Sequence, residues 1–75
     1  MNSYENNTQL LVKTRRHRKQ ALEVILQQII AIRNAEADYM DRVPDNLCGT
    51  ENYEVAEDAV SVLDEIITMM EEVYP

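Results

Sequence analysis

The sequence is poor in the residues that build small cross-linked or metal-bound domains. Its 75 residues include one cysteine, one histidine, one glycine and two prolines, and no tryptophan or phenylalanine. A single cysteine excludes an internal disulfide framework, and with one histidine it leaves too few ligands for a structural zinc site. A chain this short buries only about 60% of its unfolded surface, so its own core is marginal. We therefore expect self-association, without a metal or another cofactor.

Basic residues are scarce in the second part of the chain. Residues 1–33 carry six bases and two acids, whereas residues 34–75 carry one base and twelve acids. The net charge of −7 disfavours generic binding to nucleic acid or to an anionic membrane. The polarity along the chain predicts that oppositely charged parts pair, either within one chain or between chains.

The sequence also lacks a long apolar run. A membrane-spanning helix needs about 20 apolar residues in succession, and Glu23, Gln27 and Gln28 interrupt the longest apolar segment, residues 21–32. The same interruptions argue against a secretory signal, although basic, apolar and small residues follow one another over residues 13–37. Because a lone thiol also suits a reducing compartment, the chain is predicted to be soluble and cytoplasmic, with no membrane segment.

Turn-forming residues are concentrated in one segment, VPDNLCGTEN, at residues 43–52. Elsewhere the frequent Leu, Ile, Ala, Glu and Gln favour helix. The prediction is a polar N-terminal tail over residues 1–7 and a single helical-hairpin domain over residues 8–75. Within that domain we expect helix one at about 8–41, a linker at 42–50 and helix two at about 51–74.

Local signals refine the ends of these elements. Thr8 is expected to cap helix one, and Thr50 is expected to cap helix two, whose first turn is acidic. Within the linker, Pro44 is suited to begin a single helical turn. Gly49 is suited to end that turn in a left-handed conformation.

Both helices carry more apolar surface than one partner helix covers. With Tyr53 at heptad position a, helix two is apolar at positions a, c, d and g. At about 100° per residue these positions span an arc of about 160°. Helix one has a similar apolar stripe, which is broken by Glu36 and widened by further apolar residues on one side. So much apolar surface on a monomer would predict aggregation.

The predicted fold class is therefore all-α, an antiparallel hairpin of two long helices that assembles into a homo-oligomeric helical bundle. A homodimer that forms a four-helix bundle, with coiled-coil packing, is the favoured form, and a trimer or larger assembly stays open. The residues expected in the oligomer interface are Leu22, Ile25, Leu26, Ile29, Ile30, Ile32, Val60, Leu63, Ile66, Ile67 and Met70.

A basic cluster lies in the segment KTRRHRK and comprises Lys13, Arg15, Arg16, Arg18 and Lys19. Arginine suits bidentate phosphate contacts, so the cluster is a candidate phosphate-binding site for nucleic acid or a nucleotide second messenger. Against this, the segment has no aromatic residue for base stacking. In an antiparallel hairpin, Glu71 and Glu72 would also arrive beside Arg18 and Lys19. The competing interpretation is electrostatic pairing within the assembly.

No catalytic residues are predicted. His17 and Cys48 belong to opposite ends of the expected hairpin, so they do not form a nucleophilic dyad. Acids that repeat every seven residues on helix two are typical of the solvated face of a bundle, and imitation of DNA phosphates is the functional alternative. These acids are Glu57, Asp58, Asp64, Glu65, Glu71 and Glu72.

Residues 39–67, YMDRVPDNLCGTENYEVAEDAVSVLDEII, carry a D-x-x-P-[DE]-N-L linker, a Thr cap and then Y-E-x-A-E-x-A-[IV]. This pattern resembles a group of short acidic helical-hairpin proteins encoded by phages and mobile elements of gut bacteria. It covers a little over a third of the chain, and Cys48 and Gly49 depart from the polar pair expected in the group. The resemblance implies an all-α hairpin of mobile-element origin and no particular activity.

Together these features predict a non-enzymatic, oligomeric helical protein that binds another macromolecule. Its most concrete form is a phage or mobile-element accessory factor that inhibits a host protein. The alternative is a phosphate-ligand binder, for nucleic acid or a sequestered nucleotide, that uses the basic cluster.

Overall fold

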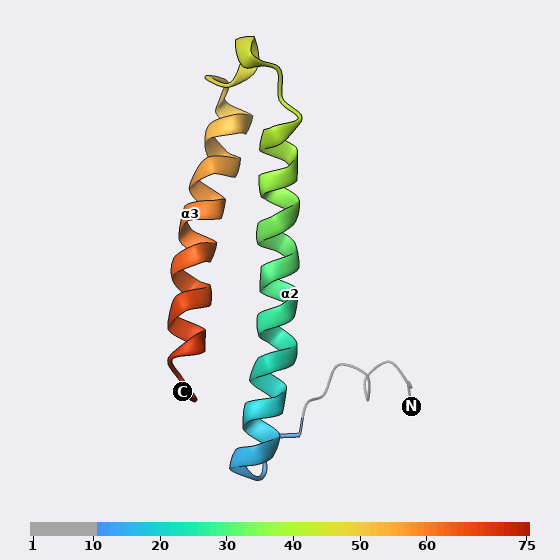
Figure 1. Ribbon diagram of the computed structural model, residues 1–75, viewed down its shortest axis with the longest axis vertical. Coiled ribbons are helices and arrows are strands. Elements are labelled where there is room, and N and C mark those ends of the chain that lie inside the picture. The colour runs from blue at the N-terminus through green and yellow to red at the C-terminus, as the bar shows by residue number, and fades with distance from the viewer. Residues whose placement is uncertain (1–10) are drawn as a thin grey trace, which may run out of the picture.

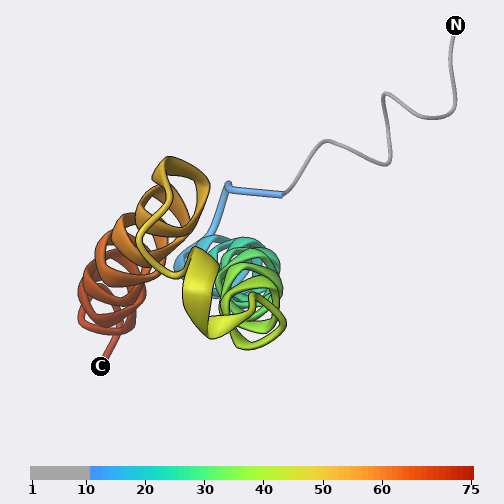
Figure 2. The same ribbon diagram turned by 90° about the horizontal axis from the view of Figure 1, so that it is seen from above.

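The computed structural model describes residues 11–75, which form two antiparallel helices joined by a short linker (Figure 1). Helix α2 spans Arg15–Asp41, the 3-10 helix η1 spans Asp45–Leu47, and helix α3 spans Glu51–Glu71. Residues 11–75 contain no strand, and the two long helices lie side by side in one layer (Figure 2). The predicted helical hairpin is confirmed. The predicted tail over residues 1–7 and the predicted cap Thr8 lie outside the described residues.

Helix α2 begins later than the sequence predicted. Residues 11–14 are not helical, and Thr14 is the N-cap, with an extended backbone and a hydroxyl oxygen that accepts a hydrogen bond from the His17 N–H at 3.0 Å. The Arg18 guanidinium donates to the carbonyl oxygens of Val12 and Lys13 at 3.1 and 3.4 Å. These bonds hold the carbonyls of the preceding segment in a non-helical turn. The predicted helix over residues 8–41 is therefore wrong for residues 11–14.

The linker occupies residues 42–50, as predicted, and contains one short helical turn, η1. Pro44 lies immediately before this turn rather than in it. The predicted left-handed Gly49 is wrong, because no described glycine has a positive φ. A Cβ added at Gly49 would meet no atom within 4 Å, so neither the backbone conformation nor crowding requires glycine there.

Helix α3 begins after Thr50, with Glu51 and Glu54 in its first turn, where the helix dipole favours acids. Thr50 occupies the predicted cap position, but its hydroxyl donates to the Leu47 carbonyl at 2.9 Å instead of accepting from the helix. The helix ends at Glu71, three residues before the predicted end.

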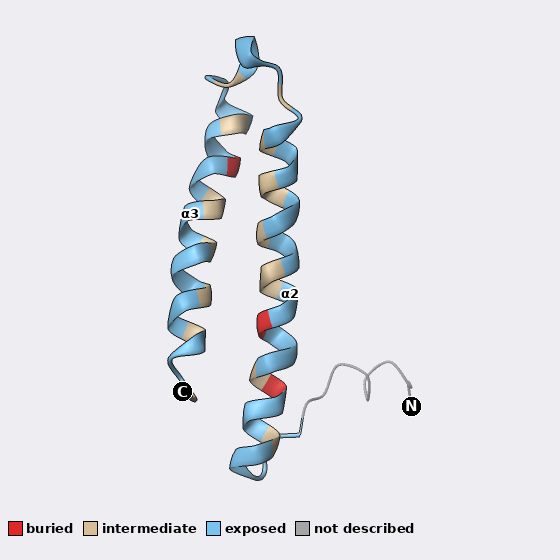
Figure 3. Cartoon of the chain, in the orientation of Figure 1, coloured by how far each residue is buried: buried red, intermediate tan, exposed pale blue. Residues whose placement is uncertain are grey.

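The core between the helices is small (Figure 3). Among residues 11–75 only Ala21, Leu26 and Ala56 are buried. Of these, Leu26 and Ala56 lie on the lines that face the other helix, and Ala56, at 2% exposure, is the most enclosed. On α2 the line that faces α3 contains Leu26, Arg33 and Met40, which recur every seven residues and lie on one side of the helix. On α3 the facing residues are those at heptad positions a and d, which are Tyr53, Ala56, Val60, Leu63, Ile67, Met70 and Tyr74.

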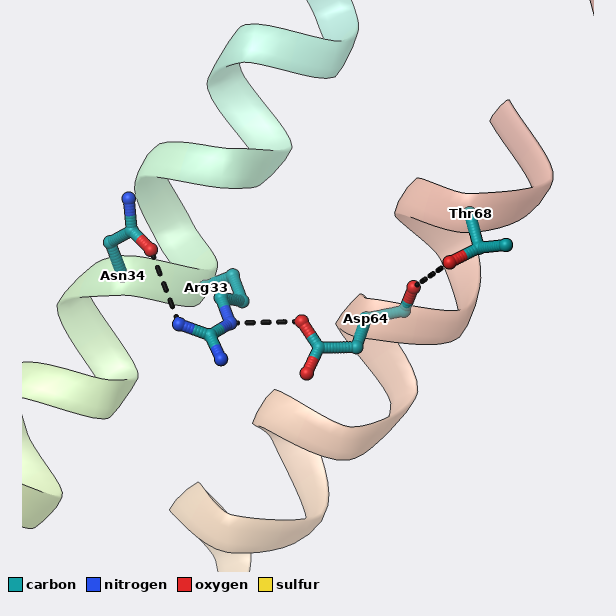
Figure 4. A network of polar contacts seen from close by, with 4 residues as sticks. All are labelled: Arg33, Asn34, Asp64 and Thr68. Carbon is teal, nitrogen blue, oxygen red and sulfur yellow. Dashed lines mark hydrogen bonds and ion pairs between the residues drawn. The ribbon is translucent and has the colours of Figure 1, made fainter. Parts of the chain in front are cut away.

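One ion pair joins α2 to α3 (Figure 4). The Arg33 Nε lies 2.9 Å from the Asp64 Oδ1, and it is the one salt bridge within residues 11–75. Both side chains are partly exposed, at 34% and 53%, so the pair stabilises the fold by at most about 1 kcal/mol. Its main effect is to fix which residues of α2 and α3 are level with one another.

Candidate interaction surface

Helix α2 carries a second apolar stripe that α3 leaves uncovered. Ile25, Ile32 and Tyr39 are exposed and recur every seven residues, with Ile32 at 55% exposure. At about 100° per residue they lie roughly a quarter turn from the line of Leu26 and Arg33 that faces α3. The half-buried Glu36 interrupts this stripe between Ile32 and Tyr39.

Helix α3 has a matching stripe beside its contact with α2. Val55, Ala59, Val62, Ile66, Met69 and Val73 alternate in spacings of four and three, the repeat of a coiled-coil seam. All except the half-buried Ala59 are exposed, and Met69 reaches 67%. This stripe holds heptad positions c and g, whereas the acidic positions e and f lie on either side of the apolar arc.

The two uncovered stripes lie on the same side of the hairpin. On each helix the stripe is rotated by about a quarter turn, in the same rotational sense, from the line that faces the other helix. Since the helices run antiparallel, equal rotations bring both stripes to one side. We call this surface the apolar face, and it consists of Ile25, Ile32, Tyr39, Val55, Val62, Ile66, Met69 and Val73.

The predicted oligomer-interface residues therefore divide into two groups. Leu26 is buried between the helices, and Leu22, Ile29, Ile30, Val60, Leu63, Ile67 and Met70 are half-buried. Ile25, Ile32 and Ile66 are exposed on the apolar face. The sequence prediction omitted five residues of the apolar face, although the apolar residues at heptad positions c and g gave a signal for the four in the α3 stripe. The five are Tyr39, Val55, Val62, Met69 and Val73.

The opposite side of the hairpin carries an open groove of about 540 Å³ near the free ends of the helices, lined by both polar and apolar side chains. We call it the open-end groove. Its polar lining includes Arg16, Lys19, Glu23 and Glu71, and its floor includes Leu26. Two bases and two acids therefore meet in one hollow, so their charges largely offset one another.

The structure distributes the basic cluster over the start of α2 and the residue before its cap. Lys13 precedes Thr14, and Arg15, Arg16, Arg18 and Lys19 occupy the first turns of the helix. The predicted pairing of these residues with Glu71 and Glu72 is not formed, because the ion pair of Arg33 with Asp64 is the one salt bridge in the described chain. Arg18 binds backbone carbonyls instead.

The remaining reactive side chains lie apart from one another. Cys48 is a free thiol in the linker that donates to the Pro44 carbonyl at 3.6 Å, and His17 is in the first turn of α2, at the other end of the hairpin. Partial burial raises the pKa of Tyr53, and Cys48 and Glu57 act in the same direction. Within residues 11–75 no group of His, Cys, Asp or Glu is arranged to hold a metal ion.

A second groove, of about 410 Å³, lies at the linker end between Tyr39, Val43, Pro44 and Leu47. It adjoins the apolar face through Tyr39, and the exposed Leu47 enlarges the apolar surface there. The apolar face thus continues to the linker end of the hairpin.

Comparisons with protein-family models, with curated proteins and with solved structures find no match for this chain. The resemblance to phage-encoded hairpins stays a prediction. Neither α2 nor α3 combines the length and the apolar character that a membrane crossing requires.

Proposed function

We propose that this chain is a non-catalytic interaction protein, whose hairpins assemble through the apolar face and bind another macromolecule as an assembled bundle. The observation that carries the proposal is the apolar face itself. Eight large apolar side chains stay exposed on one side of the hairpin, whereas only three of residues 11–75 are buried. A contiguous apolar patch of this kind marks a protein interaction site more often than a free surface.

The biological role that we propose is that of an accessory factor of a phage or mobile element, which acts in the cytoplasm by occluding a host protein. The lone thiol suits the cytoplasm, and the linker and cap pattern of residues 39–67 supports the mobile-element origin. The outer side of α3 offers exposed acids at Asp58, Glu65 and Glu72, one every two turns. These acids suit a host partner with a basic surface.

The test is affinity capture from host lysate with a matched pair of double variants. Val62→Glu with Met69→Glu places two charges on the apolar face. Ser61→Glu with Thr68→Glu places the same charges one residue earlier on the exposed polar side of α3. We call Val62→Glu with Met69→Glu the face pair and Ser61→Glu with Thr68→Glu the control pair. We expect one host protein to be captured by the wild type and by the control pair but not by the face pair. Equal capture by both pairs would contradict the proposal.

A second candidate function is phosphate binding by the basic cluster. The observation that favours it is the late start of α2, because the bases then lie where the helix dipole also attracts anions. The acids in the open-end groove weaken it. If oligonucleotide or cyclic-nucleotide binding falls steeply with salt and vanishes in an Arg15→Ala, Arg16→Ala, Arg18→Ala triple variant, this candidate replaces the first.

A further inference from the structure

We infer that the apolar face is covered by a second copy of this chain, in a two-fold dimer whose linkers lie at opposite ends. This inference rests on the proposed function and deepens it, since it names the first partner and its orientation. Three features of the described residues support it: the size of the apolar face, its symmetry about the level of the Arg33–Asp64 ion pair, and the charges at the two ends of the hairpin.

The size of the apolar face suits a small specific dimer. Its eight side chains average about half exposure. Transfer energies imply that complete burial of one such side chain removes about 100 Å² of apolar surface. Complete burial of the eight half-exposed side chains would therefore remove roughly 400 Å² from each copy. Roughly 800 Å² for the pair corresponds to about 1,200 Å² of total interface, because about 65% of a homodimer interface is apolar. That total is at the lower end of stable, specific interfaces.

The position of the apolar face along the hairpin suits a two-fold axis perpendicular to the helices. On α2 the stripe runs from Ile25 to Tyr39, and its middle is Ile32. On α3 the stripe runs from Val55 to Val73, and its middle is residue 64. The ion pair between Arg33 and Asp64 shows that these two middles are level. The face therefore extends equally to either side of the level of the ion pair, as a perpendicular two-fold axis at that level requires.

This axis places α2 of one copy antiparallel to α2 of the other. Ile32 then lies opposite Ile32 of the second copy, and Ile25 lies level with Tyr39 of the second copy, beside its linker-end groove. By the same count Glu36 is level with Gln28 of the second copy, a polar residue that is exposed in the single hairpin. The interrupting acid is thus level with a hydrogen-bond donor rather than another acid.

The charges at the two ends select this orientation over one with both linkers together. The open end, residues 11–23 and 71–75, carries five bases and three acids among its side chains, a net charge of +2. The linker end, residues 38–54, carries one base and five acids, a net charge of −4. When the linkers lie at opposite ends, the open end of one copy, with charge +2, meets the linker end of the other, with charge −4, at each end of the bundle. Linkers together would bring like charges to both ends, which is unfavourable.

The first experiment measures mass by light scattering over a range of micromolar concentrations. We expect a dimer for the wild type and for Ser61→Glu with Thr68→Glu, and a single folded chain for Val62→Glu with Met69→Glu. Circular dichroism checks that both pairs remain helical. A wild type that stays a single chain at every concentration would overturn the inference. That result would also remove the assembled bundle from the proposed function, but binding of a host protein through the apolar face would survive if the face pair still lost host capture.

The second experiment tests the orientation by cross-linking in a Cys48→Ser background. Ile32→Cys places two thiols at the two-fold axis, where their Cα atoms come within the ~7 Å that a disulfide allows. Val24→Cys is the control, since Val24 is 47% exposed on the same helix but outside the apolar face. We expect rapid oxidation to a covalent dimer for Ile32→Cys alone. A dimer by light scattering in which Ile32→Cys cross-links no faster than Val24→Cys would refute the opposite-linker arrangement.

Discussion

Replacement of Leu26 by alanine tests how the hairpin is held together. Leu26 is 8% exposed and is the largest of the three buried residues in the described chain. Removal of a leucine side chain from a closed core costs about 2–5 kcal/mol. Leu26 also forms part of the floor of the open-end groove, so water and neighbouring side chains have access to the vacated space. We therefore expect the lower end of that range, about 2 kcal/mol.

A loss of this size is large for so short a chain. At typical values per residue, 75 residues give a free energy of unfolding of about 4–11 kcal/mol. Leu26→Ala would remove between about a fifth and a half of it, and it would lower Tm by roughly 8–16 °C. The assay is urea unfolding followed by circular dichroism, at one fixed protein concentration because association also stabilises the fold.

Val24→Ala is the matched control. Val24 lies on the same helix and is 47% exposed, so its truncation loses about 1 kcal/mol of burial at most. Alanine regains about half of that through its higher helix propensity. We expect a net change within about 0.5 kcal/mol. If Leu26→Ala destabilises the protein no more than Val24→Ala does, the assignment of Leu26 to the core is wrong.

Two further predictions concern the helix ends and the linker. Thr14→Ala should lower the free energy of unfolding by about 1 kcal/mol in the same urea assay, because the Thr14 hydroxyl caps α2. Thr50→Ala should lower it by less, because the Thr50 hydroxyl donates to a linker carbonyl instead of capping α3. A larger loss for Thr50→Ala than for Thr14→Ala would contradict these cap assignments. Since partial burial raises the pKa of Tyr53 above 10.0, helped by Cys48 and Glu57, the neutral phenol is favoured in the folded state. The stability that this preference contributes is complete below pH 10 and is lost as pH rises through the folded pKa of Tyr53. The measurement is tyrosinate absorbance against pH for the wild type minus that for Tyr53→Phe, and its midpoint should lie above pH 10. A midpoint at or below pH 10 would refute this prediction.

The sequence was sufficient to predict the hairpin but not which stripe of helix α2 would face α3. The turn residues between Val43 and Asn52 interrupt two strong helical patterns, so the connection was visible. On α2, however, the stripes that contain Ile25 and Leu26 are adjacent and both apolar. The stripe that faces α3 includes Arg33, which pairs with Asp64 across the helices, and periodicity alone does not reveal such a cross-helix pair.

The start of α2 was mispredicted for a similar reason. Thr8 and Thr14 both precede the helical pattern, and both are good caps. The bonds from Arg18 to the carbonyls before Thr14 favour the later start. Such a side-chain to backbone contact depends on a local turn, and no sequence pattern signals it. The same late start places the basic cluster at the very beginning of the helix, whereas the prediction placed a turn or more of helix before it.

The position of these bases has a consequence for how the protein responds to its solvent. Arg15 and Arg18 do not line the open-end groove, whose acids offset Arg16 and Lys19. Arg15 and Arg18 repel one another and also oppose the positive pole of α2, whose first turn has no acid. Dissolved ions screen this repulsion. They also screen the attraction between Arg33 and Asp64, but that pair contributes at most about 1 kcal/mol, so little stability is lost. Moderate salt should therefore tighten the first turns of α2, so this hairpin gains order where most charge-paired helices would fray.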